Sequence, residues 1–364
     1  MKVLLINSVC GIGSTGRIVG AQAEAYIAQG YEVKIAYGRD GRVPEKYRPY
    51  ARRIGTDMDV RISAVRTRVL DDHGFANQAA TRAFLRWADD YNPDLLWLHN
   101  LHGYYLHVGL LFDWIKSRPW MQVKWTLHDC WAFTGHCAHF TYAGCDRWQT
   151  GCHNCPEKKS YPASCLLDNS RANYLRKKTA FTGVTNLRLI VPSRWLAGLV
   201  KQSFLGEYPV EICPNTIDTD IFRPTDSTFR QKHGLTNKKM ILGVAGGWTE
   251  RKGFRDFLKL REILDDSCAI VLVGVSEDQN RKLPPGILGI SRTENPRELA
   301  EIYTAADLFF NPTYEDTYPT VNLEAESCGT RVITYDTGGC AETITGPDSR
   351  AIPPGSYELV KKLL

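Results

Sequence analysis

Long hydrophobic runs are missing from this sequence of 364 residues. None approaches the roughly 18 apolar residues that a membrane-spanning helix needs. The first apolar run, residues 2–6, is interrupted by Asn7 and is followed by a glycine-rich turn in place of a cleavage site. This favours a first β-strand over a signal peptide. The sequence therefore predicts a cytoplasmic protein.

A strong excess of charge of one sign is also missing. Lysine and arginine number 45 and Asp and Glu number 40, which gives a net charge of +5. This mild positive balance permits attraction to acidic lipid but does not indicate a nucleic-acid partner. We therefore expect no nucleic acid, and the charge is compatible with peripheral association at the inner face of the membrane.

The chain does contain regular alternation of apolar runs with helical patterns, which is typical of an α/β fold with parallel sheets. A first set of strands is expected at residues 3–7, 32–37, 94–99, 123–127, 187–192 and 210–213. A second set is expected at residues 240–245, 269–274, 307–310 and 331–335. The two sets predict two Rossmann-like domains, 1–222 and 223–364, with a linker near residues 222–237. Residues 42–86 carry charged, helical patterns that indicate no function.

The most informative stretch runs from residue 311 to residue 342. After the buried strand at 307–310, Thr320 is expected to N-cap a helix that ends at Ser327, and Gly329 suits a left-handed residue after that helix. Gly338 and Gly339 are expected to lead from the next strand into a second helix. Two helix N-termini at one sheet edge would suit a phosphate, because their unpaired N–H groups carry partial positive charge.

The same edge carries several carboxylates. Because carboxylates repel phosphate, they are expected to face a neutral part of the ligand that is rich in hydroxyl groups. A phosphate joined to a sugar meets both demands. These acidic residues are Glu315, Asp316, Glu324 and Glu342.

Two glycine-rich turns add candidate phosphate contacts. Gly11 and Gly13 belong to a G-x-G-x-x-G turn after the first strand, where glycine lets backbone N–H groups come close to a ligand. Lys252 lies beside the glycine-rich turn that follows the first strand of the second set, where it is a candidate point charge for a ligand. Arg251 beside it could act in the same way or point into solvent.

Histidines mark the ends of two strands in the first domain. His99, Asn100 and His102 follow the strand at 94–99, and His128 and Asp129 follow the strand at 123–127. Ligands of open α/β sheets collect at the carboxyl ends of the strands. We therefore expect His128 to be functional, whereas His99 and His102 could serve the ligand or only cap loops.

Five of the eleven cysteines fall within residues 130–155. The last four, Cys137, Cys145, Cys152 and Cys155, have the spacing C-x7-C-x6-C-x2-C, which could supply four thiolates to a structural zinc ion. The segment has little apolar periodicity, so we expect something other than a core to order it. Reduced thiols, or disulfides in an oxidising compartment, are the alternatives.

Several of these motifs resemble the family-4 retaining glycosyltransferases. Asp316, seven residues, Glu324, Ala325 and then Cys-Gly-Thr at 328–330 are similar to the donor motif of that family, although its first acidic residue is usually Glu, so that Glu315 could take that place. Residues 214–218 resemble the family's Pro-Asn-Gly-Ile-Asp segment, with Thr216 in the place of Gly. Gly247 stands where the family has an Arg.

A subset of that family, the colanic-acid type exopolysaccharide transferases, carries a block similar to residues 128–156. The shared elements are the His-Asp pair, Thr-Gly-x-Cys at 134–137, Gly-Cys at 144–145, Trp148, and Thr-Gly-Cys-x-x-Cys-Pro at 150–156. The resemblance covers almost the whole chain but does not indicate whether a metal is bound.

The resemblance implies a GT-B fold, with two Rossmann-like domains facing across a cleft. It implies an acceptor-side domain at 1–222, with a Cys-rich insertion at 130–165, and a nucleotide-sugar donor domain at 223–364. The enzyme would transfer a sugar from a nucleoside diphosphate to a saccharide, including a lipid-linked glycan, in surface glycan synthesis, without a catalytic metal. It implies three catalytic residues, His128, Lys252 and Asp316. The residues expected to bind the donor are Gly11, Gly13, Arg251, Lys252, Glu315, Asp316, Tyr318, Thr320, Glu324, Gly338 and Gly339.

Three other functions remain open at this point. A nucleotide-sugar 2-epimerase would share the fold but act on the donor alone. An NAD-dependent oxidoreductase would rest on the first glycine-rich turn only. A zinc-bearing nucleic-acid binding module, which would not be an enzyme, would use the aromatic and basic residues beside the cysteines, and binding at low salt would reveal it.

Overall fold

Short runs of leucine, isoleucine and valine form the centres of two parallel sheets, because strands covered by helices on both faces are apolar throughout. The computed structural model describes residues 1–364, which divide into two compact units, 1–213 and 214–364. This division lies between Cys213 and Pro214, before the predicted boundary at residue 222.

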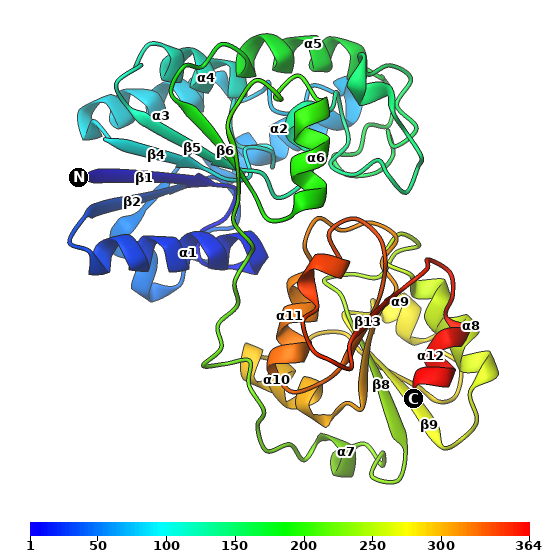
Figure 1. The fold of residues 1–364 in the computed structure, drawn as a ribbon. Helices are drawn as coiled ribbons and strands as arrows, with labels where there is room; N and C mark the ends of the chain where they lie inside the picture. Colours follow the sequence, from blue (N-terminus) through cyan, green and yellow to red (C-terminus); the bar gives the residue numbers. More distant parts are fainter. The chain divides into compact units, whose positions relative to one another are not determined.

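The first unit contains a seven-stranded parallel sheet in the order β3-β2-β1-β4-β5-β6-β7. Figure 1 shows α1 on one face of this sheet and α3, α4 and α5 on the other. The strands are β1 (Lys2–Asn7), β2 (Glu32–Tyr37), β3 (Ala51–Arg53), β4 (Leu95–Leu98), β5 (Gln122–Thr126), β6 (Leu187–Val191) and β7 (Val210–Ile212). The α-helices are α1 (Gly13–Ala28), α2 (Asp57–Leu70), α3 (Gln78–Tyr91), α4 (Val108–Lys116), α5 (Ser170–Phe181) and α6 (Arg194–Gln202). Short 3-10 turns are η1 (Glu45–Tyr50), η2 (Trp131–Phe133) and η3 (Arg147–Gln149).

The second unit contains a six-stranded parallel sheet in the order β10-β9-β8-β11-β12-β13. Figure 1 shows α10 and α11 on one face and α8 and α12 on the other. The strands are β8 (Lys239–Val244), β9 (Cys268–Val273), β10 (Ile287–Ile290), β11 (Leu308–Asn311), β12 (Val332–Tyr335) and β13 (Arg350–Ile352). The helices are α7 (Phe229–Lys232), α8 (Phe254–Ile263), α9 (Glu277–Asn280), α10 (Pro296–Ala305), α11 (Thr320–Ser327), α12 (Glu358–Leu363) and the 3-10 turn η4 (Ala341–Thr343).

Both sheets follow the doubly wound arrangement. In each, the first strand of the unit lies in the middle, the next two strands extend to one side, and the later strands extend to the other. The side on which new strands are added to the sheet therefore switches at β1 in the first unit and at β8 in the second. The α/β class and the Rossmann-like sheets are as predicted.

Two local predictions at the second sheet are wrong. Helix α11 begins at Thr320 itself, and Pro319 occupies the N-cap position without a side-chain hydrogen bond. The segment after Gly338 and Gly339 forms only the 3-10 turn η4, because the β-branched run at 343–345 and the Gly-Pro pair at 346–347 are poor helix formers. The sheet edge thus has one of the two expected α-helix N-termini there. In the first unit, helix α1 begins at Gly13, inside the glycine-rich turn.

The cysteine-rich segment lies in the hydrophobic core of the first unit, contrary to the expectation that it lacks core-forming residues. Trp131, Phe133, Phe140 and Trp148 are buried there, and the rings of Phe133 and Trp148 lie 5.3 Å apart between centroids. Periodicity did not reveal them because the segment contains only short turns between its aromatic residues. Aromatic packing therefore orders this segment.

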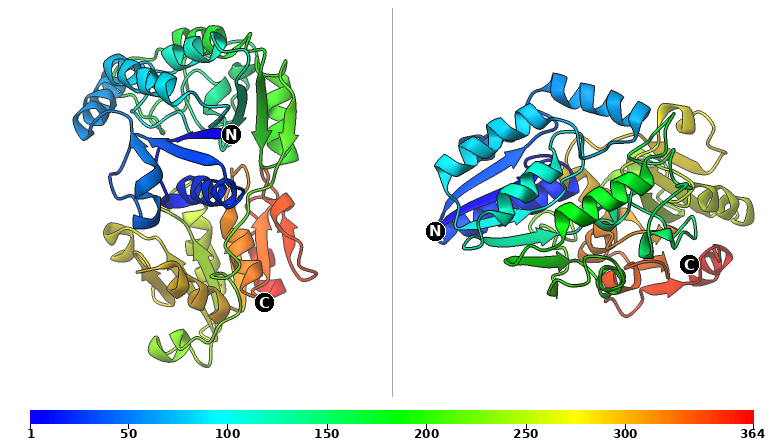
Figure 2. Two further views of the ribbon diagram at one scale, coloured as in Figure 1. Left: turned by 90° about the vertical axis from the view of Figure 1, so that its left-hand side faces the viewer. Right: turned by 90° about the horizontal axis from the view of Figure 1, so that it is seen from above.

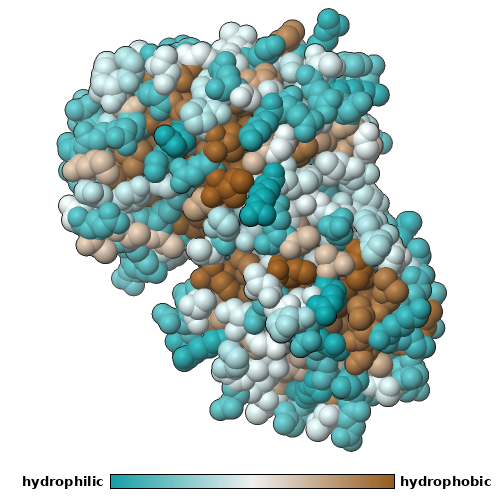
Figure 3. All heavy atoms as spheres, in the orientation of Figure 1, coloured by the Kyte–Doolittle hydropathy of each residue, from teal (hydrophilic) through white to brown (hydrophobic).

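On the face shown in Figure 3, hydrophilic side chains predominate on both units, and hydrophobic residues appear in separate groups. No helix in the structure is both long and apolar enough to cross a membrane.

Candidate functional site

The loops that follow β8 and β11 flank the point where the chain order of the second sheet reverses. These two strands are hydrogen-bonded neighbours, with Leu308 opposite Ile241 and Phe309 opposite Leu242. Helices that leave such a pair to opposite sides open a crevice at the carboxyl ends of the strands, where ligands of α/β sheets bind. Residues 245–253 and 312–319 supply the two loops.

An ion pair joins these two loops. The Lys252 ammonium lies 2.6 Å from Asp316 Oδ2, and the two side chains are 26% and 20% exposed. Both residues were predicted to serve the ligand, and the structure brings them together. Because both remain accessible to solvent, a ligand can reach the lysine and the carboxylate at the same place.

Arg251 lies against the backbone of the second loop. Its Nη1 donates to the Glu315 carbonyl at 2.7 Å, and its own carbonyl accepts from the Tyr314 N–H at 2.8 Å. The arginine thus fixes the shape of the loop that carries Glu315 and Asp316. The sequence had left open whether Arg251 binds ligand or points into solvent, and this bracing contact differs from both.

Glycines let a third loop approach the other two. Gly338 has a φ of +56°, and a Cβ added there would lie 2.0 Å from the Asp316 carbonyl oxygen. The neighbouring Gly339 N–H donates to that same oxygen at 3.0 Å. Gly253 in the first loop meets the Pro312 carbonyl in the same way, at 2.2 Å from an added Cβ. A side chain at either glycine would force these loops apart.

Of the three other acidic residues of this edge, Glu342 is half-buried, whereas Glu315 and Glu324 are buried. They are 1% and 5% exposed, and Glu324 Oε2 accepts a hydrogen bond from the Tyr303 hydroxyl at 3.1 Å. A carboxylate held by a hydroxyl donor can accept further hydrogen bonds through its other lone pairs. Tyr318 is also buried, and burial raises the pKa of its hydroxyl.

A buried chain of amide and hydroxyl groups holds this edge together, and the sequence did not predict it. Asn311 Nδ2 donates to Asn322 Oδ1 at 2.8 Å, and Asn322 Nδ2 donates to Thr343 Oγ1 at 2.8 Å. The Thr343 hydroxyl in turn donates to the Cys340 carbonyl at 2.6 Å. These bonds tie β11, α11 and η4 to one another. An asparagine at the last position of a buried strand was the only signal.

Helix α11 opens towards this edge without a side-chain cap. Pro319, at the N-cap position, has no side-chain hydrogen-bonding group and makes no side-chain cap. The first N–H groups of a helix lack partners within the helix and carry partial positive charge. This terminus and Lys252 therefore add two positive elements to the switch point, beside the guanidinium of Arg251.

At the corresponding edge of the first unit, two histidines share a hydrogen bond. His99 Nδ1 lies 3.1 Å from His128 Nε2, and His99 Nε2 lies 2.8 Å from Gln22 Oε1. With Gln22 accepting, His99 donates to it and accepts from His128. Burial lowers the pKa of His128 to about 4, partly offset by Asp129, so both rings are neutral at pH 7.

Asp129 and His102 form a second polar pair at this edge. His102 Nε2 lies 2.7 Å from Asp129 Oδ2, and His102 Nδ1 lies 3.0 Å from the Tyr161 hydroxyl. Burial opposes ionisation of Asp129, but the charge and the hydrogen bond of His102 outweigh it and lower the pKa. The carboxyl ends of β4 and β5 thus carry a neutral histidine pair beside an acidic residue.

The two glycines predicted to approach a phosphate differ in their surroundings. A Cβ at Gly11 would lie 2.4 Å from the Tyr47 ring, whereas nothing lies within 4 Å of a Cβ at Gly13. Both have positive φ, +70° and +64°. Tyr47 therefore accounts for the glycine at position 11, and only Gly13 leaves open space for a ligand.

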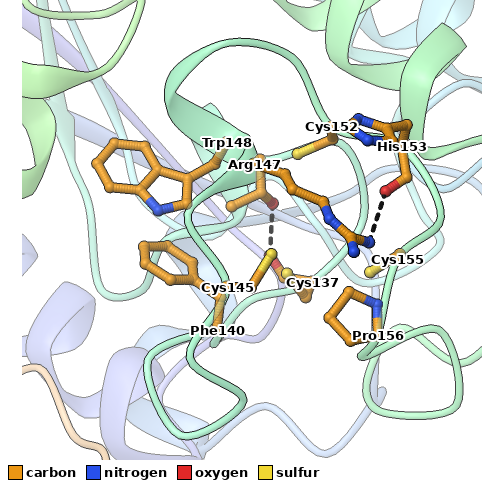
Figure 4. A pocket seen from close by; sticks show the side chains of 10 residues that line it. Cys137, Phe140, Cys145, Arg147, Trp148, Cys152, His153, Cys155 and Pro156 are labelled. Carbon is orange, nitrogen blue, oxygen red and sulfur yellow. Dashed lines mark hydrogen bonds between the residues drawn. The ribbon is translucent and has the colours of Figure 1, made fainter.

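The four cysteines predicted to bind zinc line one small pocket (Figure 4). The Arg147 guanidinium also lines it and donates to the His153 carbonyl at 3.1 Å. All eleven cysteines are free thiols in the structure. No group of three or more His, Cys, Asp or Glu side chains is placed to hold a metal ion. A cation in the pocket disfavours a second one, so the geometry gives the zinc prediction no support, and it stays a prediction.

Buried ionisable side chains lie next to the residues that line this pocket. His136 Nδ1 lies 2.5 Å from Asp71 Oδ1, and both side chains are fully buried. Lys177 is also buried, where its ammonium donates to the Trp131 carbonyl at 2.8 Å and lies 3.5 Å from the centre of the Trp131 ring. Burial lowers the pKa of Lys177 to about 7, although nearby thiols and carboxylates oppose the shift.

Comparison with protein families gives a match in the second unit. The family described as "Glycosyl transferases group 1" matches residues 225–362. A D-inositol 3-phosphate glycosyltransferase of Corynebacterium jeikeium is 26% identical over 272 residues, which cover 68% of this chain and 61% of that relative. The putative colanic acid biosynthesis glycosyl transferase WcaC of Escherichia coli is 33% identical over 132 residues, which cover 35% of this chain and 32% of that relative.

Solved structures share the fold of the chain. Sucrose-phosphate synthase from Thermosynechococcus elongatus has a TM-score of 0.72 and 18% identity, and the match covers 100% of this chain and 88% of that protein. The Anabaena protein Alr3699/HepE, solved in complex with UDP, has a TM-score of 0.66 and 14% identity, covering 100% and 89%. These matches show the GT-B fold, which contains two Rossmann-like sheets.

Titration of Lys177 should make stability depend on pH. In the unfolded chain its pKa is about 10.4, so between about pH 7 and pH 10 the unfolded chain binds a proton that the folded chain does not. The contribution of Lys177 to stability should therefore rise with pH in this window and fall as pH drops towards 7. Buried thiols such as Cys10 and Cys328, whose pKa values are raised by burial, oppose this trend in the parent and in the variants alike. Urea denaturation at several pH values should therefore show the parent and Lys178→Met, at an exposed neighbour, gaining stability relative to Lys177→Met as pH rises. Equal pH slopes for all three would contradict the assignment.

Proposed function

We propose, from the match of residues 225–362 to the group 1 glycosyl transferases, that the protein transfers a sugar from a nucleoside diphosphate to a saccharide hydroxyl with retention of anomeric configuration. One observation carries the proposal. Within the matched residues, Lys252, the acidic loop at Glu315–Asp316 and the uncapped start of α11 meet at the switch point of a doubly wound sheet.

The donor is proposed to lie along this edge. Its diphosphate is bound by Lys252 and by the first N–H groups of α11, both of which suit a phosphate group. The Glu324 carboxylate accepts hydrogen bonds from the ribose hydroxyl groups, and Asp316 or Glu315 accepts them from the hydroxyl groups of the sugar. A nucleoside diphosphate sugar is supported by the HepE structures, which were solved with UDP and with UDP-glucose.

Binding is proposed to exchange one partner of Lys252 for another. In the structure its ammonium is paired with Asp316. A diphosphate carries more negative charge than a carboxylate, so the lysine can turn to the phosphate while Asp316 accepts from sugar hydroxyl groups. The pair thus keeps both side chains at the place where the ligand is proposed to bind.

The proposed reaction replaces one C–O bond with another on the same face of the sugar. The bond between the anomeric carbon and the β-phosphate oxygen breaks, and the acceptor oxygen forms a bond to that carbon. The acceptor proton passes to the departing phosphate, so no separate carboxylate base is required. Lys252 and the α11 terminus stabilise the charge that grows on the leaving diphosphate, the part that a metal ion takes in other folds. His128 is proposed to hydrogen-bond the sugar near the reacting carbon as a neutral imidazole.

The acceptor is proposed to be a saccharide, including one linked to a lipid, in the synthesis of a surface glycan. The name of the E. coli relative supports this pathway, and so does the cysteine-containing block at residues 128–156, which resembles exopolysaccharide transferases. Incubation of the full chain with UDP-, GDP- and ADP-sugars, with and without oligosaccharide or lipid-linked acceptors, tests the proposal. A glycosylated acceptor that retains the donor's anomeric configuration supports it. An epimerised donor formed without acceptor would instead identify a 2-epimerase.

Lys252→Met should lower turnover by about 10²-fold or more, because one fixed charge is lost from the leaving group. Its ion pair with Asp316 is partly exposed, so the free energy of unfolding should change by only about 0–1 kcal/mol. The matched control is Lys239→Met, at the opposite end of strand β8. Steady-state kinetics with a saturating acceptor, together with a melting curve, measures both effects. Unchanged turnover in Lys252→Met would remove the lysine from the reaction.

Glu324→Gln should weaken nucleotide binding by about tenfold, because hydrogen bonds to a charged group contribute about 1.5–3 kcal/mol. Glu326→Gln is the matched control on the same helix. Its carboxylate accepts from the Thr345 and Gly346 N–H groups, so this change should lower stability but leave nucleotide affinity intact. Calorimetric titration of the nucleoside diphosphate decides between them. Equal affinities for parent and Glu324→Gln would show that this carboxylate does not bind the ribose.

A further inference from the structure

Helix α2 (Asp57–Leu70) turns its apolar side outward. Met58, Ile62, Val65 and Val69 are 61%, 57%, 60% and 40% exposed, while Ser63 and Thr67 on the opposite side are 1% and 0% exposed. A helix that packs on a core shows the reverse pattern. Figure 2 shows α2, coloured azure blue, at the margin of the first unit. The outward apolar residues therefore do not serve this unit's own core.

These four residues form one continuous stripe, called here the α2 stripe. They are spaced by four, three and four residues, so at about 100° per residue they fall within a sector of about 60°. Scattered exposed apolar residues are ordinary on a protein surface, but a row along three turns of one helix is a contiguous patch. The helix is firmly started, because Thr56 and Asp59 form a reciprocal capping box.

A second segment extends the apolar surface. Residues 165–167 run beside the end of α2, since the Cys165 N–H donates to the Arg68 carbonyl at 2.7 Å and the Leu167 N–H donates to the Val69 carbonyl at 3.2 Å. Leu166 and Leu167 are 65% and 48% exposed. The chain thus uses two separate segments to present leucine and valine side chains next to each other at the surface.

Cationic side chains flank the stripe. Arg61 and Arg68 lie on one side of it and Arg66 on the other, all three exposed, and Arg66 also pairs with Asp72 at 2.5 Å. The last three turns of α2 contain no acidic residue, because Asp57 and Asp59 both lie in the first turn. An apolar row between arginines is complementary to acyl chains beneath anionic headgroups.

We propose that the α2 stripe docks on an anionic lipid bilayer, with α2 lying in the plane of the interface. Its 14 residues extend about 21 Å at 1.5 Å per residue, less than the ~30 Å of a bilayer core, so the helix cannot span it. The stripe enters the acyl boundary, and the arginine stems let their guanidinium groups reach the phosphates. Docking needs no sugar transfer, so it stands or falls separately from the proposed function.

Vesicle flotation of the full chain tests the proposal. The chain should float with vesicles of phosphatidylethanolamine and phosphatidylglycerol and bind vesicles of phosphatidylcholine much more weakly. Ile62→Ser with Val65→Ser should weaken binding by about tenfold or more, because two aliphatic side chains are lost from the acyl boundary. Arg61→Gln with Arg68→Gln should weaken it by about fivefold per arginine, and more at low salt than at high salt. Trp120→Ser, at an exposed tryptophan outside α2, should bind like the parent.

Each outcome supports or contradicts docking of the α2 stripe on a bilayer. All substituted residues are exposed, so melting curves should match that of the parent, and Met58→Ser with Val69→Ser gives an independent pair if the first pair fails to fold. Equal flotation of parent and stripe variants would overturn the proposal, as would a parent that binds neither vesicle. A parent dimer that the stripe variants dissociate, seen by light scattering without vesicle binding, would assign the stripe to a second copy of this chain.

Discussion

The ion pair between Lys252 and Asp316 is the contact on which the candidate site depends. It joins the loops after β8 and β11. After β8 the chain continues to β9 on one side of the sheet, and after β11 it continues to β12 on the other side. A lone lysine at this edge would be a mobile point charge, and a lone carboxylate would repel phosphate. Together they hold each other at the sheet edge, with both side chains accessible to a ligand that carries a phosphate and a sugar.

The remainder of the edge keeps that pair in place. Gly338 lets a third loop touch the Asp316 carbonyl, Arg251 braces the loop from the other side, and the chain from Asn311 through Asn322 to Thr343 fixes α11 relative to η4. These contacts are buried or made by backbone groups, so the loop shape is set before a ligand arrives. A preformed site loses less conformational entropy when the ligand binds.

The sequence predicted the parts of the molecule that depend on local pattern. Apolar strands such as 240–245 follow from periodicity. Lys252 and Asp316 were assigned to the donor site by the resemblance to the glycosyltransferase motifs, and their ion pair was not predicted. The asparagine chain could not be predicted, because Asn311, Asn322 and Thr343 are ordinary polar residues that meet only in the fold. The inverted helix α2 and the aromatic core of the cysteine segment were missed because burial, unlike periodicity, depends on what packs nearby.

The central claim is that the second unit binds a nucleoside diphosphate sugar, and thermal melting of the full chain with a panel of ligands tests it most directly. A ligand that binds the folded state at about 100 times its Kd stabilises it by about 2.7 kcal/mol and raises the melting temperature. The account predicts that one of the UDP-, GDP- or ADP-sugars raises the melting temperature and that NADH does not. A shift with NADH alone, or with none of the nucleoside diphosphate sugars, would contradict it.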